Sequence, residues 1–117
     1  MTKLETKTFE APDATRTPER TTVELVNLEL GAVGRYTFEP GWRWSEHVKP
    51  VAKTESCEVD HVGYVTEGRI HVRHNDGAEI EIGPGDVYHI PPGHDSWVVG
   101  DERFVAIEFQ GAAGYAT

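Results

Sequence analysis

The residues best suited to chemistry in this chain are its histidines and its single cysteine. All six histidines fall between His47 and His94, and Cys57 lies among them. Imidazole and thiolate are preferred ligands for zinc, iron, copper and nickel, and a β-barrel brings residues that are distant in sequence around one cavity. The clustering favours a metal site, and the opposing interpretation is that these side chains are ordinary core and surface residues.

His61 is the histidine whose neighbours predict an inward-facing ring. Val59, Gly63 and Val65 share its parity along a predicted strand, and all three are core-type residues. Cys57 keeps the same parity, which directs its thiol toward the same cavity. Two interpretations stay open for each side chain: His61 is a metal ligand or a hydrogen-bonded core residue, and Cys57 is a ligand or a small apolar filler.

His71 and His74 are predicted to be surface residues. His71 alternates with Arg69 and Arg73 on a polar strand face, and His74 adjoins a turn at residues 75–77. The Asp-Gly pair of that turn supplies the positive φ angles of a tight hairpin.

The three tryptophans are the next candidates. Trp42 and Trp44 alternate along a strand predicted over residues 42–47, and a third indole stands at Trp97. Each alone is explained by packing, whereas their association with histidine-bearing segments favours an aromatic-lined ligand pocket.

Short β-type runs separated by glycine and proline carry these residues. They are predicted at residues 23–30, 33–38, 42–47, 58–67, 69–74, 78–82, 87–90, 97–99 and 104–109. The alternating apolar residues expected to face the core include Ile70 with Val72, Ile80 with Ile82, and Val105 with Ile107 and Phe109. No apolar pattern of helical period extends over three turns, so the sequence predicts an antiparallel β-sandwich or barrel with little helix.

Residues 1–22 are predicted to be an extended N-terminal arm, and residues 23–117 the β domain. The arm is polar, and Leu4 and Phe9 are its only large apolar residues. They are the natural contacts if the arm docks on a neighbouring subunit. The length of 117 residues leaves room for one small domain.

The net charge and the hydropathy of the chain indicate which classes of partner and which compartment to expect. Acidic residues number 20 against 11 basic ones, and the net charge of −9 repels nucleic acid and anionic lipid. No apolar run approaches the length of a spanning helix, and the polar start has no signal-peptide core. One cysteine cannot form an internal disulfide, which fits a reducing compartment. We therefore expect a cytoplasmic protein with a small-molecule partner.

The segment GPGDVYHIPPGHDSWVVGD resembles the second conserved motif of the cupin family. Five residues separate Gly85 from Pro91, and one residue separates Pro91 from Gly93. The resemblance extends over about residues 33 to 109, nearly the whole β region. It implies an all-β antiparallel jelly-roll sandwich or barrel, and a homodimer.

The residues from Gly41 to Gly68 also resemble, in part, the first cupin motif. Five residues separate Gly41 from His47, and six separate His61 from Gly68. The family's four metal ligands fall on His47, Lys49, His61 and Ser96, and only His47 keeps the family's residue type. A lysine cannot ligate a metal while it holds its proton.

The altered positions leave two alternatives. In a rebuilt site, His47 and His61 are joined by Cys57, from an inserted loop at residues 51–59, and by His94, which stands two residues before the usual place. Such a set suits a divalent transition metal, namely zinc, iron, copper, nickel or manganese. In a lost site, the same cavity is metal-free, and Lys49 and Arg43 are available to pair with a carboxylate.

Two functions follow from these alternatives. The first is a metal-dependent enzyme of the dioxygenase, isomerase or decarboxylase type that acts on a small organic molecule, with Tyr64, Glu46 or Lys49 as proton-transfer groups. The second is a non-catalytic protein that binds or senses a small molecule in the barrel. The residues expected to line the pocket in either case are Trp42, Trp44, Lys49, Tyr64, Ser96 and Trp97.

Overall fold

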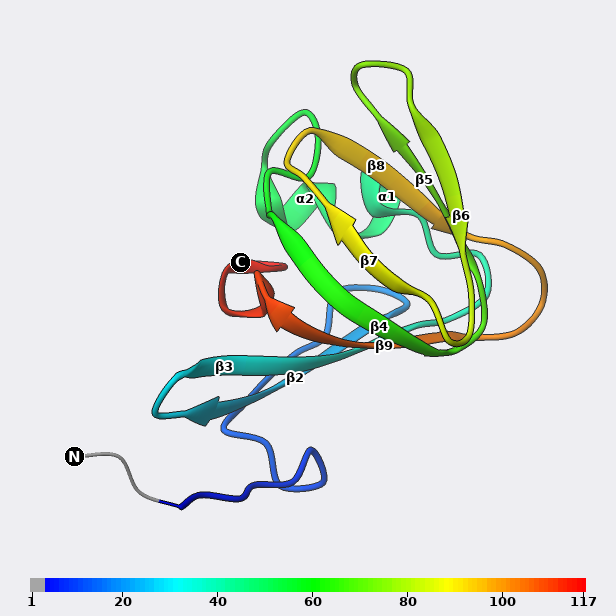
Figure 1. Ribbon diagram of the computed structural model, residues 1–117. Coiled ribbons are helices and arrows are strands. Elements are labelled where there is room, and N and C mark those ends of the chain that lie inside the picture. The colour runs from blue at the N-terminus through cyan, green and yellow to red at the C-terminus, as the bar shows by residue number, and fades with distance from the viewer. Residues whose placement is uncertain (1–3) are drawn as a thin grey trace.

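The computed structural model describes residues 4–117, and most of its regular structure is β-strand (Figure 1). The strands are β1 (Ala14–Arg16), β2 (Thr21–Leu28), β3 (Gly31–Phe38), β4 (His61–Glu67), β5 (Ile70–His74), β6 (Glu79–Ile82), β7 (Val87–Ile90), β8 (His94–Val98) and β9 (Phe104–Gln110). Two short helices, α1 (Trp44–His47) and α2 (Lys49–Ala52), and a 3-10 turn, η1 (Ala112–Gly114), complete it. No helix within residues 4–117 is long and apolar enough to cross a membrane.

The strands form two antiparallel sheets that enclose one core. The larger sheet has the order β1-β2-β3-β9-β4-β7, and the smaller has the order β6-β5-β8. The predicted antiparallel jelly-roll fold is confirmed. Edge strands β6 and β7 belong to different sheets, so the sandwich is open between them, and α1 and α2 lie at one end of it (Figure 1).

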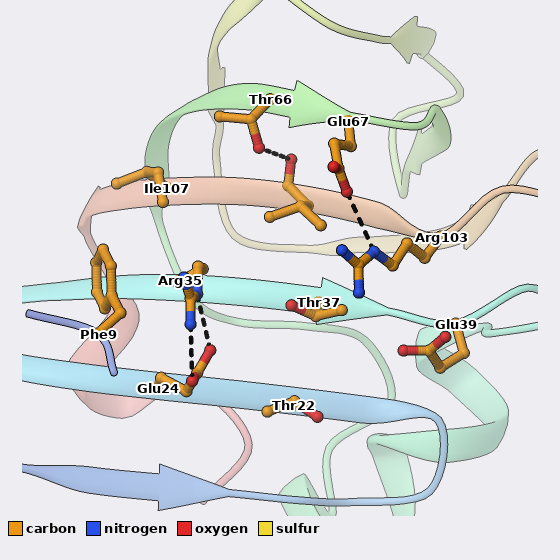
Figure 2. A pocket seen from close by; sticks show the side chains of 11 residues that line it. Phe9, Thr22, Glu24, Arg35, Thr37, Glu39, Thr66, Glu67, Arg103 and Ile107 are labelled. Carbon is orange, nitrogen blue, oxygen red and sulfur yellow. Dashed lines mark hydrogen bonds and ion pairs between the residues drawn. The ribbon is translucent and has the colours of Figure 1, made fainter. Parts of the chain in front are cut away.

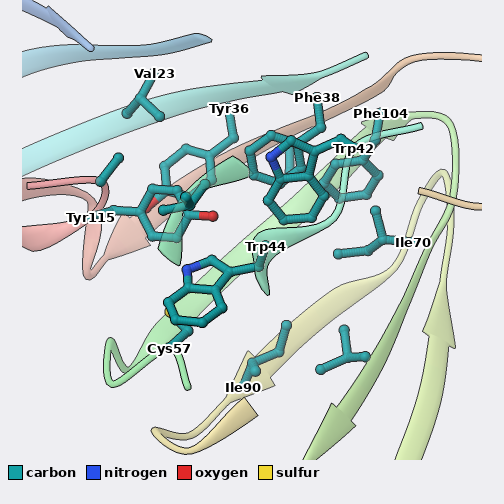
Figure 3. Close-up of a cluster of buried hydrophobic side chains, with 14 of the residues drawn as sticks. Val23, Tyr36, Phe38, Trp42, Trp44, Cys57, Ile70, Ile90, Phe104 and Tyr115 are labelled. Atoms are coloured by element: carbon teal, nitrogen blue, oxygen red, sulfur yellow. The ribbon is translucent and has the colours of Figure 1, made fainter. Parts of the chain in front are cut away.

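An aromatic cluster fills the space between the sheets (Figure 3). The rings of Phe38 and Trp42 are stacked with centroids 3.7 Å apart, and Phe104 lies 5.7 Å from Phe38. The indole nitrogen of Trp42 donates a hydrogen bond of 2.9 Å to the Thr21 hydroxyl, which satisfies its one polar group. The core is therefore built from large flat rings that leave little free volume.

The prediction of a strand over residues 42–47 is wrong, because this segment contains a helical turn. The backbone amides of Glu46 and His47 both donate to the Arg43 carbonyl, and the Val48 amide donates to the Trp44 carbonyl. A helix of four residues is too short to show an apolar period, so the Trp-x-Trp spacing resembled strand alternation. Both indoles are nonetheless buried, as core-type residues should be.

The face assignment of β9 is reversed from the prediction. Phe104, Ala106 and Glu108 are buried, whereas Phe109 is 61% exposed and Ile107 lies on the outer face of the large sheet. Strand β9 is central in its sheet and carries apolar residues on both faces, so their alternation did not distinguish inside from outside. The reversal places a carboxylate in the core.

The first 22 residues contain β1, which pairs with β2, and the start of β2 itself. Phe9 packs against its own chain, where the guanidinium of Arg35 lies 5.2 Å from the ring centroid. Leu4 is fully exposed. The homodimer expected from the sequence stays a prediction.

Strand β6 offers a matched test of the core. Ile80 and Ile82 lie on one strand face as predicted, but Ile82 is 5% exposed and Ile80 is 47% exposed, because the β5–β6 hairpin extends beyond the sandwich (Figure 1). We expect Ile82→Ala to lower the free energy of unfolding by about 2–5 kcal/mol and Ile80→Ala by less than about 1 kcal/mol. Urea unfolding measures both. Equal losses would contradict this placement of the hairpin.

Candidate functional site

Three buried side chains, Cys57, His61 and His94, meet in the interior of the sandwich. One potential ligand atom from each lies within 4.8 Å of the other two. His61 begins β4 in the large sheet and His94 begins β8 in the small one. Cys57 lies on the loop before β4, and its amide donates to the His94 carbonyl at 2.8 Å while its carbonyl accepts from the Gly93 amide at 2.7 Å. This backbone bridge joins the two sheets at the cluster.

Oxygen atoms orient both imidazole rings. Nδ1 of His61 lies 2.6 Å from Oε1 of Glu108, and the Tyr88 hydroxyl donates to Oε2 of the same carboxylate at 2.7 Å. Nδ1 of His94 donates to the Pro91 carbonyl at 2.8 Å, since a carbonyl can only accept. Nε2 is then the ring nitrogen left for a ligand in both histidines, and Nε2 of His61 is 3.6 Å from Sγ of Cys57.

The two rings have opposite electrostatic environments. Burial alone would lower the pKa of His61, but its hydrogen bonds with Cys57 and Glu108 and their charges raise it to about 9. Burial, together with the nearby positive charge of His61, lowers the pKa of His94 to about 4. One ring is therefore cationic and the other neutral near pH 7 when no metal is bound.

Aromatic side chains close around the cluster and leave a cavity of about 20 Å³. The ring centroids of Tyr36 and Tyr115 lie 6.2 Å and 5.4 Å from that of His61. Ser96 and Glu108 also line the cavity. A space of this size admits a water-sized molecule and excludes an organic one.

The C-terminal segment, residues 112–117, packs over the side of the cluster at which Cys57 lies. Nη1 of Arg16 donates to the carbonyls of Ala112 and Tyr115, at 3.2 and 2.7 Å, and so fastens this segment to β1. An outer pocket of about 210 Å³ lies beside it, lined in part by Trp44, Cys57 and Tyr115. Cys57 belongs both to this pocket and to the buried cluster, and Figure 3 shows Trp44 directly beside it.

Among the predicted metal ligands, the structure brings Cys57, His61 and His94 together and places His47 elsewhere. Nε2 of His47 lies 3.1 Å from a Glu19 carboxylate oxygen, and its Nδ1 faces the backbone of Arg43. The expectation that His47 shares the cavity with His61 is corrected by the helical turn of α1, which redirects this side chain.

The predicted pocket residues are dispersed. Ser96 lines the inner cavity, Trp44 lines the outer pocket, and Trp42 is part of the core. The other three are distant from the cluster: Lys49 pairs with exposed Glu55, Tyr64 is on the outer sheet face, and Trp97 stacks on His71 beneath Arg43. Neither Tyr64, Lys49 nor exposed Glu46 adjoins the cluster, which corrects their assignment as proton-transfer groups.

Sequence reasoning missed Glu108 and the tyrosines Tyr36, Tyr88 and Tyr115. The one available signal was Glu108, the only charged residue in the run FVAIEF. A charge in the middle of an apolar central strand costs free energy unless it is paired, so it marks an interior site.

A larger hollow, of about 690 Å³, lies away from the cluster on the outer face of the large sheet (Figure 2). Its arginines are already paired within the chain: Arg35 contacts Glu24 at 2.9 Å and Arg103 contacts Glu67 at 3.1 Å. It holds no histidine or cysteine. The imidazole and thiol donors that could hold a metal are gathered instead in the smaller interior site.

A model of the Cupin domain matches residues 34–109. A protein of unknown function from Rhizobium leguminosarum is similar in structure over 92% of this chain and 95% of its own, with 24% identity and a TM-score of 0.66. A polyketide cyclase from Streptomyces resistomycificus aligns over 91% and 79%, with 18% identity and a TM-score of 0.58. An oxalate decarboxylase variant from Bacillus subtilis aligns over 82% and 27%, with 22% identity and a TM-score of 0.55. Comparison with curated proteins finds no match.

The opposite pKa shifts predict how the stability of the metal-free protein depends on pH. Protonation of His61 adds to the free energy of unfolding, because the folded state binds this proton more tightly than the unfolded state does. This contribution is complete below pH 6.5 and is lost as the pH rises through about 9. The neutral His94 ring also adds to the free energy of unfolding, because the folded state binds a proton there less tightly than the unfolded state does. This contribution is lost as the pH falls from 6.5 toward about 4. Each amounts to roughly 3 kcal/mol.

Urea unfolding at a series of pH values, with a chelator present, measures this profile. We expect His61→Gln to flatten its alkaline side and His94→Gln its acidic side. His89→Gln is the control, because that side chain is 61% exposed. An unchanged alkaline side in the His61 variant would contradict the assigned shift.

Arg16 is expected to control access to Cys57. Arg16→Ala removes both hydrogen bonds that fasten the C-terminal segment, so a thiol reagent should modify Cys57 about tenfold faster or more. Arg69→Ala is the control, because Arg69 pairs with Glu81 on the surface. Equal modification rates in the wild type and the Arg16 variant, at equal global stability, would refute the role given to Arg16.

Proposed function

The chain belongs to the cupin family, and from this premise we propose that Cys57, His61 and His94 hold one divalent transition metal ion inside the sandwich. The observation that carries the proposal is the geometry of the donors: two imidazoles whose Nδ1 atoms are held by oxygens, facing one thiol within 4.8 Å. Metal-binding histidines are commonly oriented in this way.

The charge of the site also fits a cation. Two neutral imidazoles and one thiolate leave a divalent ion with one positive charge, and the Glu108 carboxylate beside His61 offsets it. The hydrogen bonds with Cys57 and Glu108 that raise the pKa of His61 to about 9 keep a proton on Nε2 in the metal-free protein, and a metal would displace that proton. A soft thiolate with two imidazoles suits zinc, iron(II), copper or nickel better than magnesium or calcium.

We propose further that the site acts on a small organic molecule in a reaction of the dioxygenase, isomerase or decarboxylase type. That molecule would occupy the outer pocket of about 210 Å³ that Cys57 also lines, because the inner cavity is too small for it. A bound metal would supply Lewis acidity at a position left open by three protein ligands. Nδ1 of His61 and Oε1 of Glu108 lie 2.6 Å apart and hold a proton between them, and the surrounding rings leave room for no more than a water-sized molecule. The fold is shared with a polyketide cyclase and an oxalate decarboxylase, so it accommodates such chemistry.

A second candidate function is metal-free binding of a small molecule. It is favoured by the outer pocket of about 210 Å³, which has room for a small organic ligand and presents Trp44 and Tyr115 to it. In this alternative, Cys57 and His61 form a hydrogen-bonded pair at 3.6 Å, and no metal is required.

Elemental analysis of protein purified without an affinity tag separates the two functions. We expect one equivalent of metal in the wild type, a near-complete loss in Cys57→Ser and His61→Ala, and full retention in His89→Ala, whose ring is on the surface. Metal should raise the melting temperature and a chelator should reverse that rise. If the wild-type protein stays metal-free after incubation with zinc, iron(II), copper, nickel and manganese, the metal site is refuted and metal-free binding of a small molecule becomes the supported function.

A further inference from the structure

Tyr36 presents a buried hydroxyl to the interior cavity. Its side chain is on β3, and only 2% of the residue is exposed. Within residues 4–117, the Tyr36 hydroxyl is the one buried side-chain polar atom without a hydrogen-bond partner. Buried polar groups are nearly always paired, so this hydroxyl calls for a partner outside the chain.

The Glu108 carboxylate does not fill that role. Glu108 acts on this hydroxyl through its charge and its proximity, but no hydrogen bond of good geometry joins the two. The well-formed hydrogen bonds of the carboxylate are with His61, at 2.6 Å from Oε1, and with the Tyr88 hydroxyl, at 2.7 Å from Oε2. Burial, and next the negative charge of Glu108, raise the pKa of Tyr36 well above its ordinary value. The hydroxyl therefore keeps its proton near neutral pH and is a hydrogen-bond donor.

The cavity beside this hydroxyl has the size and polarity of a site for one small ligand. Its volume of about 20 Å³ exceeds the roughly 10–15 Å³ that one water molecule requires. His61, His94, Ser96 and Glu108 supply polar side chains to its wall. Phe38 and Phe104 complete the wall with apolar rings that prevent a larger ligand from entering.

We propose that this cavity binds one water-sized hydrogen-bond acceptor, such as water, hydroxide or fluoride, and that the Tyr36 hydroxyl orients it beside His61 and His94, two of the three donors. The proposal deepens the proposed function, since the acceptor would stand at the position that three protein ligands leave open. Tyr36 is then a positioning residue that selects the ligand by size and by its ability to accept a hydrogen bond.

Fluoride binding to the Co²⁺-loaded protein tests this role through visible absorption, without any assay of activity. We expect Tyr36→Phe to weaken fluoride binding by about tenfold or more, as loss of a hydrogen bond to an anion should, while Co²⁺ affinity changes by less than about twofold. Tyr64→Phe is the matched control, because that hydroxyl is on the outer sheet face. Acetate, which is too large for the cavity, should leave the spectrum unchanged.

Unchanged fluoride affinity in Tyr36→Phe, or acetate binding as tight as that of fluoride, would overturn the inference while leaving the metal site intact. Failure of Co²⁺ to bind would refute the proposed function alone. In that case, a high-resolution crystal structure of the metal-free protein is decisive. Ordered solvent within hydrogen-bond distance of Tyr36 Oη supports the inference, and a dry cavity overturns it.

Discussion

The contact between Glu108 and His61 is the constraint on which the rest of the interior depends. Both residues are 3% exposed, and their side chains meet at 2.6 Å. A carboxylate so deeply buried is tolerated only when it is paired and fully hydrogen-bonded, and Tyr88 supplies the remaining bond. The pair sets the inward face of β9, aims Nε2 of His61 at Cys57, and balances the charge of that ring.

Close backbone approach allows this arrangement. At Gly63 on β4, a Cβ atom would lie 2.5 Å from the Tyr88 hydroxyl and 2.6 Å from the Ile107 carbonyl. The absence of a side chain there lets the hydroxyl of Tyr88, on β7, pass over Gly63 of β4 and reach Glu108 on β9. Strands β7, β4 and β9 thus deliver Tyr88, His61 and Glu108 to one point, and the Cys57–His94 bridge adds the small sheet.

The fold could be predicted because its evidence is local: period-two alternation, glycine-containing turns and a motif near Gly85 and Pro91. Strand parity likewise indicated the inward direction of His61. Alternation could not show on which face Glu108 lies, since β9 is apolar on both faces and its register depends on two neighbouring strands and irregularities in their pairing; its charge within an apolar run was the only clue. The assignment of His47 by motif position failed because a helix of four residues leaves no periodic signal.

The residues that build the interior and those that seal it lie in different parts of the chain. Cys57, His61, His94 and Glu108 fall inside the matched domain at residues 34–109, whereas Arg16 and Tyr115 fall outside it on either side. Entry and chemistry are therefore encoded by separate stretches of sequence. Substitution of Arg16 would alter which molecules reach the centre and leave the donor residues in place, whereas β2 and Tyr115, which also lie outside the matched residues, pack in the core and have to be kept.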